Sequence, residues 1–297
     1  MPWLATRDRR RLHVRVVGRG DPCLLVHGFA SDGSSWLPFV TPWLGRHRFI
    51  VPDLAGFGRS HAAPLGQPCP LTAYAHDLAD VLDALEVDRV RIVGISMGAF
   101  AALQYMRLYG QTRVRSYLHV DQGLMIRSRS DQPHGLLGTQ QARFFSRLGA
   151  VLDAVGEERA LDALAPAVRK ELLALFGEFC AAGFAGRVLP WLVRGAARRE
   201  VVARRMMPVA NLSTHFAIMR AYLERDYDMR DVVAGLQVPV TALIGARSRM
   251  YPPEGQRILS QLCPHARVRE VAGTGHMIPL ESPLRFAREL GTFLSAP

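Results

Sequence analysis

The 297-residue chain is predicted to adopt an α/β fold, with a mostly parallel central sheet flanked by helices and interrupted by a helical insertion. Three observations support this prediction. Short apolar runs alternate with amphipathic helical stretches over residues 11–120, and the same alternation returns near the carboxyl terminus. From Gly123 to about Val233, helical periodicity continues without a convincing strand. We therefore expect a core domain of residues 1–122 and 236–297 that carries a helical domain of residues 123–235.

The first half of the sheet is predicted from short runs of β-forming residues. Leu12–Val17 alternates in hydrophobicity as a hairpin or edge strand does. Apolar runs that end in turn residues are typical of buried parallel strands. The predicted buried strands are Cys23–His27, Phe49–Val51 and Val90–Gly94, with a further strand at Val114–Val120. Helices are expected between them at Leu71–Leu85 and Met97–Tyr109.

The second half of the chain first continues as helices and then returns to the sheet. The predicted helices of the insertion are Gln140–Val155, Glu157–Glu178, Val188–Met207 and Leu212–Tyr222. The elements predicted after it are a strand at Val238–Ile244, a helix at Pro253–Leu262, a strand at Ala266–Val271 and a helix at Pro283–Leu294. We expect the insertion to lie over the carboxyl edge of the sheet, where open α/β sheets bind ligands.

Composition excludes several classes of protein. The chain is 49% hydrophobic and 21% charged, but its apolar runs are shorter than the ~18 residues that a membrane span needs. The amino-terminal stretch MPWLATRDRRR is basic but is not followed by an apolar segment, so we expect no signal peptide. Four scattered cysteines without a C-x-x-C pair predict neither a disulfide framework nor a zinc site. A reducing cytoplasm is the expected location.

The net charge of +11 comes almost entirely from arginine, since Lys170 is the single lysine. The arginines are spread along the whole chain and accompany no recognisable nucleic-acid-binding module, so we expect no nucleic-acid partner. One segment, Arg187–Arg205, is basic and partly amphipathic. A solvated helix pair is the simpler interpretation of it, and contact with a membrane surface is the alternative. The sequence makes no prediction of the oligomeric state.

A candidate nucleophile lies in the stretch GISMG at residues 94–98. The string is common by itself, but here it follows an apolar strand and begins an amphipathic helix, which is the context that a nucleophile elbow requires. Glycines at the first and last positions let the strand and helix approach closely. The turn then presents the hydroxyl of Ser96 at the edge of the sheet.

Two glycine-containing loops supply the other groups of an acyl-transfer site. The loop VHGFA at residues 26–30 follows the first buried strand, and its Phe29 amide and the amide of Met97 are candidates for an oxyanion hole. His27 and Gly28 of the same loop are expected to contact substrate. The late loop AGTGHMIPL carries His276, and histidine is the side chain that most often acts as a general base.

The motifs HGF at 27–29, PDLAGFGRS at 52–60, GISMGAF at 94–100 and GTGHMIPLESP at 273–283 resemble the α/β-hydrolase superfamily in order and spacing. The resemblance implies an α/β-hydrolase fold with an all-helical cap inserted after the sixth strand. It further implies Ser96 as nucleophile, His276 as base, and Phe29 and Met97 as oxyanion donors. No metal or other cofactor is expected.

The chain departs from the superfamily pattern where the catalytic acid is usually found. In VTALIGARSRMYPPE the turn after the strand carries Ser248, and the next carboxylate is Glu254. A hydroxyl can orient an imidazole, but it cannot stabilise the imidazolium that forms during the reaction. Asp121, just past the strand that follows the Ser96 helix, is the preferred candidate, since some branches of the superfamily take their acid from this strand. Glu254 and an acid-free pair of Ser96 and His276 are the alternatives.

A serine nucleophile with an oxyanion hole predicts acyl transfer rather than the alkyl transfer that needs a carboxylate nucleophile. The insertion is rich in Leu, Phe, Met and Trp, which indicates an apolar substrate pocket. The expected activity is hydrolysis of a small hydrophobic ester, or of another acyl substrate, through an acyl-serine intermediate. A thioesterase, a lactonase and a hydrolase of C–C bonds are alternatives with the same machinery. A ligand-binding protein with weak catalysis is an alternative of another class.

Overall fold

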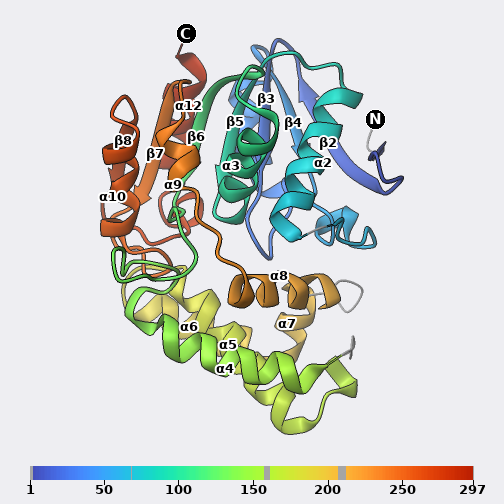
Figure 1. Cartoon of the computed structure of the whole chain (residues 1–297), viewed down its shortest axis with the longest axis vertical. Helices are drawn as coiled ribbons and strands as arrows, with labels where there is room; N and C mark the ends of the chain where they lie inside the picture. Colours follow the sequence, from blue (N-terminus) through green and yellow to red (C-terminus); the bar gives the residue numbers. More distant parts are fainter. Residues whose placement is uncertain (1–2, 68, 157–160, 207–211, 297) are drawn as a thin grey trace.

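The computed structural model describes residues 3–67, 69–156, 161–206 and 212–296. Eight strands form one sheet in the order β1-β2-β4-β3-β5-β6-β7-β8 (Figure 1). The β1–β2 and β2–β4 pairs are antiparallel and the remaining pairs are parallel. The strands are β1 Trp3–Ala5, β2 Arg11–Gly18, β3 Asp21–Val26, β4 His47–Pro52, β5 Val90–Ile95, β6 Val114–Val120, β7 Val240–Gly245 and β8 Arg267–Val271. The predicted mostly parallel sheet is therefore confirmed.

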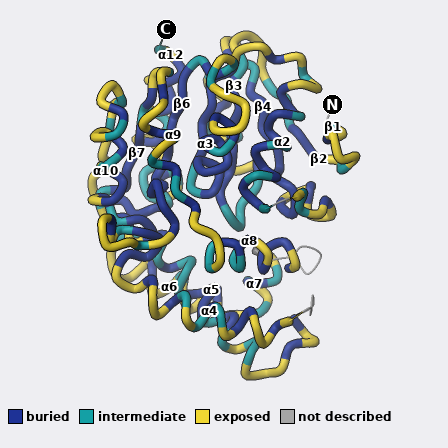
Figure 2. Tube along the Cα trace, viewed as in Figure 1, coloured by how far each residue is buried: buried dark blue, intermediate teal, exposed yellow. Residues whose placement is uncertain are grey.

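Helices cover both faces of this sheet. In β3, Leu24 and Val26 belong to one apolar core, while Cys23 and Leu25 belong to the other, because successive side chains of a strand point to opposite faces. The helices outside the insertion are α1 Leu37–Val40, α2 Pro70–Ala84, α3 Met97–Tyr109, α10 Pro253–Leu262, α11 Ile278–Glu281 and α12 Pro283–Ser295. Helices α2, α3 and α10 contribute to the first core, and α1 and α12 to the second. Figure 2 shows the central strands buried between these layers.

The predicted insertion is helical and follows β6. Its helices are α4 Gln141–Val155, α5 Pro166–Ala182, α6 Val188–Ala197, α7 Glu200–Met206, α8 Leu212–Glu224 and α9 Arg230–Ala234. Helices α4 to α8 form a layer beyond one end of the sheet (Figure 1). Where the segment leaves and rejoins the sheet, Met125 and Asp228 form an isolated antiparallel bridge. In the part of the chain that the structure describes, no helix is long and apolar enough to cross a membrane.

Several predicted boundaries need correction. The strand β1 was not predicted, because three residues carry too little periodicity to be recognised. The helix expected at Glu157–Glu178 begins at Pro166, where the fixed φ of proline suits the first helical turn, and residues 157–160 lie outside the described residues. The single helix expected at Val188–Met207 is two helices, α6 and α7, and Met207 lies outside the described residues.

Candidate active site

Ser96 lies in the sharp turn between β5 and α3. Its backbone adopts φ 53° and ψ −128°, a strained conformation for a residue with a side chain. A Cβ at Gly94 would lie 2.6 Å from the carbonyl oxygen of Gly98, and one at Gly98 would lie 2.3 Å from the carbonyl oxygen of Val26. The close contact of β3, β5 and α3 therefore requires both glycines, as predicted from sequence, and it fixes the turn that carries Ser96.

The loop after β3 lies directly against Ser96. A Cβ at Gly28 would lie 3.1 Å from the Cβ of Ser96 and 3.7 Å from its hydroxyl oxygen. Met97 is the first residue of α3, and the first N–H groups of a helix have no partner within that helix. Gly28 therefore lies against Ser96, Phe29 lines the same cavity as Ser96, and Met97 follows Ser96 in the chain.

His27 has a different position from the one expected. Its side chain is fully buried, with Nδ1 2.8 Å from the carbonyl oxygen of Gly28 and Nε2 accepting the Leu54 N–H at 3.0 Å. Burial lowers the pKa of this imidazole, so it stays neutral. The expectation that His27 contacts substrate is wrong, because both ring nitrogens are engaged by backbone groups. His27 instead joins the loop after β3 to the loop after β4.

His276 and Asp121 are hydrogen-bonded across the carboxyl edge of the sheet. Nδ1 of His276 lies 2.8 Å from Oδ2 of Asp121, and both side chains are buried. Asp121 directly follows β6 and has a φ of 40°, in the left-handed region. His276 lies in the loop after β8. The structure therefore brings the predicted base next to the predicted acid, although 155 residues separate them in the sequence.

Three further donors hold the Asp121 carboxylate. Its Oδ1 accepts the Gly245 N–H at 2.9 Å and the Gln256 amide at 2.8 Å, while Oδ2 also accepts the Ser248 hydroxyl at 2.8 Å. The pattern of the β7 turn points to Ser248 but does not predict this contact, and the contact of Gln256 was not predicted from sequence. A polar residue on the buried face of the predicted helix Pro253–Leu262 was the available signal.

Glu254 is not in a position to act as the acid. Its side chain is 58% exposed, and its nearest cation is Arg257, at 3.7 Å on the same helix. A different carboxylate, Glu281, has a structural role near His276. It accepts the Gly275 N–H at 2.7 Å and the Ala185 N–H at 2.8 Å. Glu281 thereby joins the loop that carries His276 to the segment between α5 and α6.

Ser96 and His276 open into a cavity of about 500 Å³ between the sheet edge and the helical insertion. This volume lies in the range of small-molecule sites. The sheet side of the wall includes Gly28, Phe29, Ile95, Ser96 and His276. The helical side includes Phe179, Cys180, Val193, Ala196, Ala197 and Val202. Among the described residues, the wall contains no Asp, Glu, Lys or Arg side chain, so the cavity suits a neutral, largely apolar ligand.

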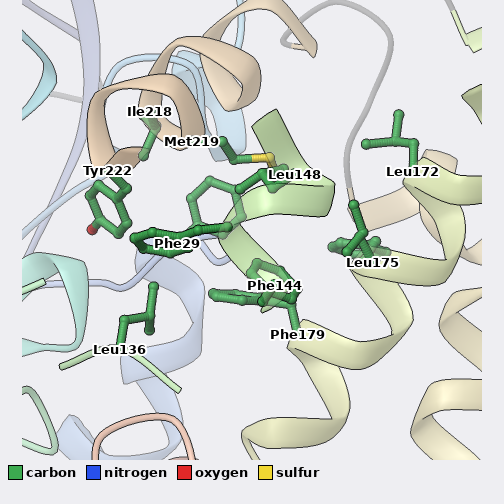
Figure 3. Close-up of a pocket in the computed structure, with 12 residues that line it drawn as sticks. Phe29, Leu136, Phe144, Leu148, Leu172, Leu175, Phe179, Ile218, Met219 and Tyr222 are labelled. Carbon is green, nitrogen blue, oxygen red and sulfur yellow. The ribbon is translucent and has the colours of Figure 1, made fainter. Parts of the chain in front are cut away.

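A second, smaller cavity of about 40 Å³ lies behind Phe29 and Phe179, which line both spaces. Figure 3 shows its wall, to which Leu148, Ile218 and Tyr222 contribute from α4 and α8. The Phe29 ring packs edge-on against Phe179, with ring centroids 5.9 Å apart. These two rings therefore separate the cavity that Ser96 and His276 line from an apolar space inside the helical insertion.

One buried histidine near the site has a strongly altered pKa. Burial lowers the pKa of His119, on β6, to about 4. Its ring nitrogens lie 2.8 Å from the Tyr117 hydroxyl and 2.7 Å from the Gln122 carbonyl oxygen. His119 is therefore neutral at pH 7. It belongs to the interior of the sheet edge that carries Asp121, not to the cavity wall.

The eight-stranded sheet, the strained serine turn and the buried His276–Asp121 pair define an α/β-hydrolase-like protein. The model of the alpha/beta hydrolase fold family matches residues 21–283, so the chain belongs to this family. The suspected family relationship is confirmed.

Individual relatives carry different activities in their names. The 2-hydroxy-6-oxo-2,4-heptadienoate hydrolase of Pseudomonas putida is 40% identical over 92 residues, which are 30% of this chain and 33% of that protein. The chain thus spans about a third or less of the length of the first curated relatives that it matches. An esterase from Exiguobacterium antarcticum has a TM-score of 0.76 at 21% identity, over 99% of both chains. A bromoperoxidase from Bacillus anthracis has a TM-score of 0.74 at 22% identity, over 98% of this chain and 99% of that one. At these identities the structural likeness shows the fold alone.

Proposed function

We propose that the protein is a serine hydrolase that cleaves hydrophobic carboxylic esters through an acyl-Ser96 intermediate. The main supporting observation is that Ser96 and His276 line one apolar cavity while His276 is hydrogen-bonded to the buried Asp121 at 2.8 Å. A buried carboxylate at Nδ1 fixes the tautomer that leaves Nε2 free to accept a proton, and it stabilises the imidazolium.

In this mechanism the Ser96 hydroxyl oxygen attacks the ester carbonyl carbon while His276 accepts the hydroxyl proton. The negative charge that forms on the carbonyl oxygen is stabilised by the N–H groups of Phe29 and Met97. When the tetrahedral intermediate collapses, His276 returns the proton to the leaving alcohol. Water, deprotonated by His276, then attacks the acyl carbon, releases the carboxylic acid and restores Ser96. His276 thus carries out each proton transfer of the reaction.

The composition of the cavity wall supports an ester with apolar parts on both sides of the reacting bond. A substrate with its own carboxylate, such as the one in the name of the Pseudomonas relative, would need a basic partner in the site. The described wall offers none, so hydrolysis of a substrate with its own carboxylate is less well supported. A neutral thioester or lactone fits the same wall and is distinguished by assay.

Covalent labelling and a substrate panel test this function. A fluorophosphonate should modify wild-type protein with one adduct per chain and leave Ser96→Ala unlabelled. The protein should also hydrolyse p-nitrophenyl esters with a preference among acyl chain lengths, in parallel assays with acyl-CoA substrates and a neutral lactone. If folded wild-type protein is neither labelled nor active, the binding-protein alternative replaces the hydrolase. A strong preference for a thioester or lactone would instead reassign the substrate class.

A further inference from the structure

The outward face of α6 is unusually apolar for a helix on the surface of a protein. Val188 and Trp191 are each 72% exposed, Leu192 is 53% exposed and Leu189 is 43% exposed. These four residues are called the α6 surface below. Surface helices normally turn polar residues to solvent, and a helix that is apolar all round is normally buried. The α6 surface is therefore a contact surface that the described chain leaves uncovered.

The α6 surface is continuous with the mouth of the reactive cavity. The side chains of Val193 and Ala196, on the same helix, line that cavity together with Ser96 and His276. Leu280 of α11 also lines the cavity and is 64% exposed. Whatever covers the α6 surface therefore also lies next to residues that line the cavity of Ser96 and His276.

Basic residues border the α6 surface on one side. The basic residues are Arg187, Arg194 and Arg198, called the arginine line below. Their i, i+7, i+11 spacing, with Trp191 at i+4, places them along one line of the helix. Residues 187–199 include no acidic residue. One of these arginines, Arg198, lies 4.0 Å from the carboxylate of Glu178 on α5. The net charge of the whole chain is +11. A positively charged border beside an apolar face that includes a tryptophan is typical of helices that lie in a lipid interface.

We propose that the α6 surface docks on an anionic lipid surface, with the mouth of the cavity facing the lipid. The arginine line supplies the charge complementarity for acidic headgroups, and Trp191 and Leu192 supply the apolar contact. A second copy of the chain is a poorer occupant. In a two-fold dimer the same patch meets itself, so the arginine lines of two copies would face a surface of their own sign.

Sedimentation with vesicles tests the docking directly. Wild-type protein should bind phosphatidylglycerol vesicles far more strongly than phosphatidylcholine vesicles, and added salt should weaken binding. Trp191 emission should shift to shorter wavelength on binding, and Trp191→Phe should remove most of that shift while preserving binding. Ser96→Ala should bind as wild type does, because docking does not depend on catalysis. The result is therefore independent of whether the proposed ester hydrolysis is correct.

Paired variants separate the apolar contribution from the charge. Trp191→Gln with Leu192→Gln should weaken vesicle binding at least tenfold. The control Leu108→Gln removes an exposed leucine near the carboxyl end of α3 and should change binding less than twofold. Neither change touches a residue that lines the cavity, so turnover of a dissolved short-chain ester should stay the same.

Removal of the arginine line should weaken binding to phosphatidylglycerol vesicles by about 100-fold, at about fivefold per residue. The variant is Arg187→Gln, Arg194→Gln and Arg198→Gln combined. The matched control removes three charges at the amino ends of strands, on the opposite edge of the sheet: Arg46→Gln, Arg89→Gln and Arg267→Gln combined. This control should lose less than fivefold.

Three results would overturn the proposal. One is wild-type protein that fails to bind phosphatidylglycerol vesicles at low salt. Another is binding that the α6 variants and their controls reduce equally, since this would indicate nonspecific attraction by the net charge. The third is a dimer in solution, detected by light scattering, that Trp191→Gln with Leu192→Gln converts to a monomer without any effect on vesicle binding. That result would assign the α6 surface to a second copy.

Discussion

The turns after β6 and β7 lie side by side at the carboxyl edge of the sheet, yet they present different groups to the site. The β6 turn supplies the buried carboxylate of Asp121, which contacts His276. The β7 turn supplies only donors, the Gly245 N–H and the Ser248 hydroxyl, and both point at that carboxylate. The acid and the groups that hold it thus come from adjacent strands and still form one buried network.

The most damaging change to this arrangement should be Asp121→Asn. An amide at this position favours the wrong tautomer of His276 and cannot stabilise the imidazolium, so kcat should fall by about 10⁴. The measurement is ester hydrolysis with the thermal unfolding midpoint as a check of folding. A folded Asp121→Asn protein with near wild-type kcat would show that Asp121 is not the catalytic acid, and it would favour the acid-free pair of Ser96 and His276.

A carboxylate moved to the β7 turn should partly restore activity. The Ser248 hydroxyl lies 2.8 Å from the Asp121 oxygen that faces His276, so a carboxylate at 248 can approach the same imidazole nitrogen. The double variant Asp121→Asn with Ser248→Asp should recover about 10-fold to 100-fold in kcat over Asp121→Asn, a small part of the loss that the missing charge causes. Ser248→Asn in the same background is the matched control and should recover nothing. Equal activity of the two double variants would show that the turns are not interchangeable.

The β6 strand should also make folding sensitive to pH, whereas the β7 turn offers no histidine. Burial lowers the pKa of His119 to about 4, so the unfolded chain binds a proton there at higher pH than the folded chain does. The free energy of unfolding should therefore decrease as pH falls from 6.5 towards 4. The decrease between pH 7 and pH 5 should be about 2 kcal/mol.

His119→Gln should remove that part of the pH dependence. Urea unfolding gives the free energy of unfolding of each protein at pH 7 and at pH 5. The change between the two pH values is then compared between wild type and variant. The difference cancels contributions from other histidines whose pKa burial lowers, such as His27 and His47. An unchanged pH dependence in His119→Gln would contradict the account.

Ser248→Ala should have the smallest effect on catalysis. It removes one of the four hydrogen-bond partners of the Asp121 carboxylate but leaves the charge and the His276 contact in place. Turnover should fall less than tenfold, while the free energy of unfolding should fall by about 1–3 kcal/mol because a buried carboxylate loses a donor. Kinetics and urea unfolding measure the two effects. A loss of turnover as large as that of Asp121→Asn would make Ser248 the more important turn residue.

Much of the core could be predicted because its elements obey local rules. Met97–Tyr109, Val114–Val120 and Pro253–Leu262 have the predicted bounds. The apolar pattern marks all three, and Gly110 after the first helix and Pro253 at the start of the second mark helix ends. The division between α6 and α7 was not predictable in this way. Arg198 and Arg199 favour helix, so the break depends on how the two helices pack rather than on a residue that ends a helix.

The site residues could be predicted where a local motif indicates their role. They could not be predicted where the contact joins residues far apart in the sequence. The serine turn and the histidine loop are readable from glycine spacing. Gln256 reaches Asp121 across 135 positions of sequence, and no local pattern encodes that contact. His27 was misassigned because the HGF motif places it near the site without indicating that its ring is buried and bonded to backbone on both sides.

The rate at which a fluorophosphonate labels Ser96 tests the role of Asp121 most directly, because it reports activation of the serine without knowledge of the natural substrate. The rate constant is measured by mass spectrometry of intact protein for wild type, Asp121→Asn and Ser248→Ala. We expect labelling to be slowed by about 10³-fold or more in Asp121→Asn and by less than tenfold in Ser248→Ala. Equal rates for Asp121→Asn and wild type, or a greater loss in Ser248→Ala, would contradict this expectation.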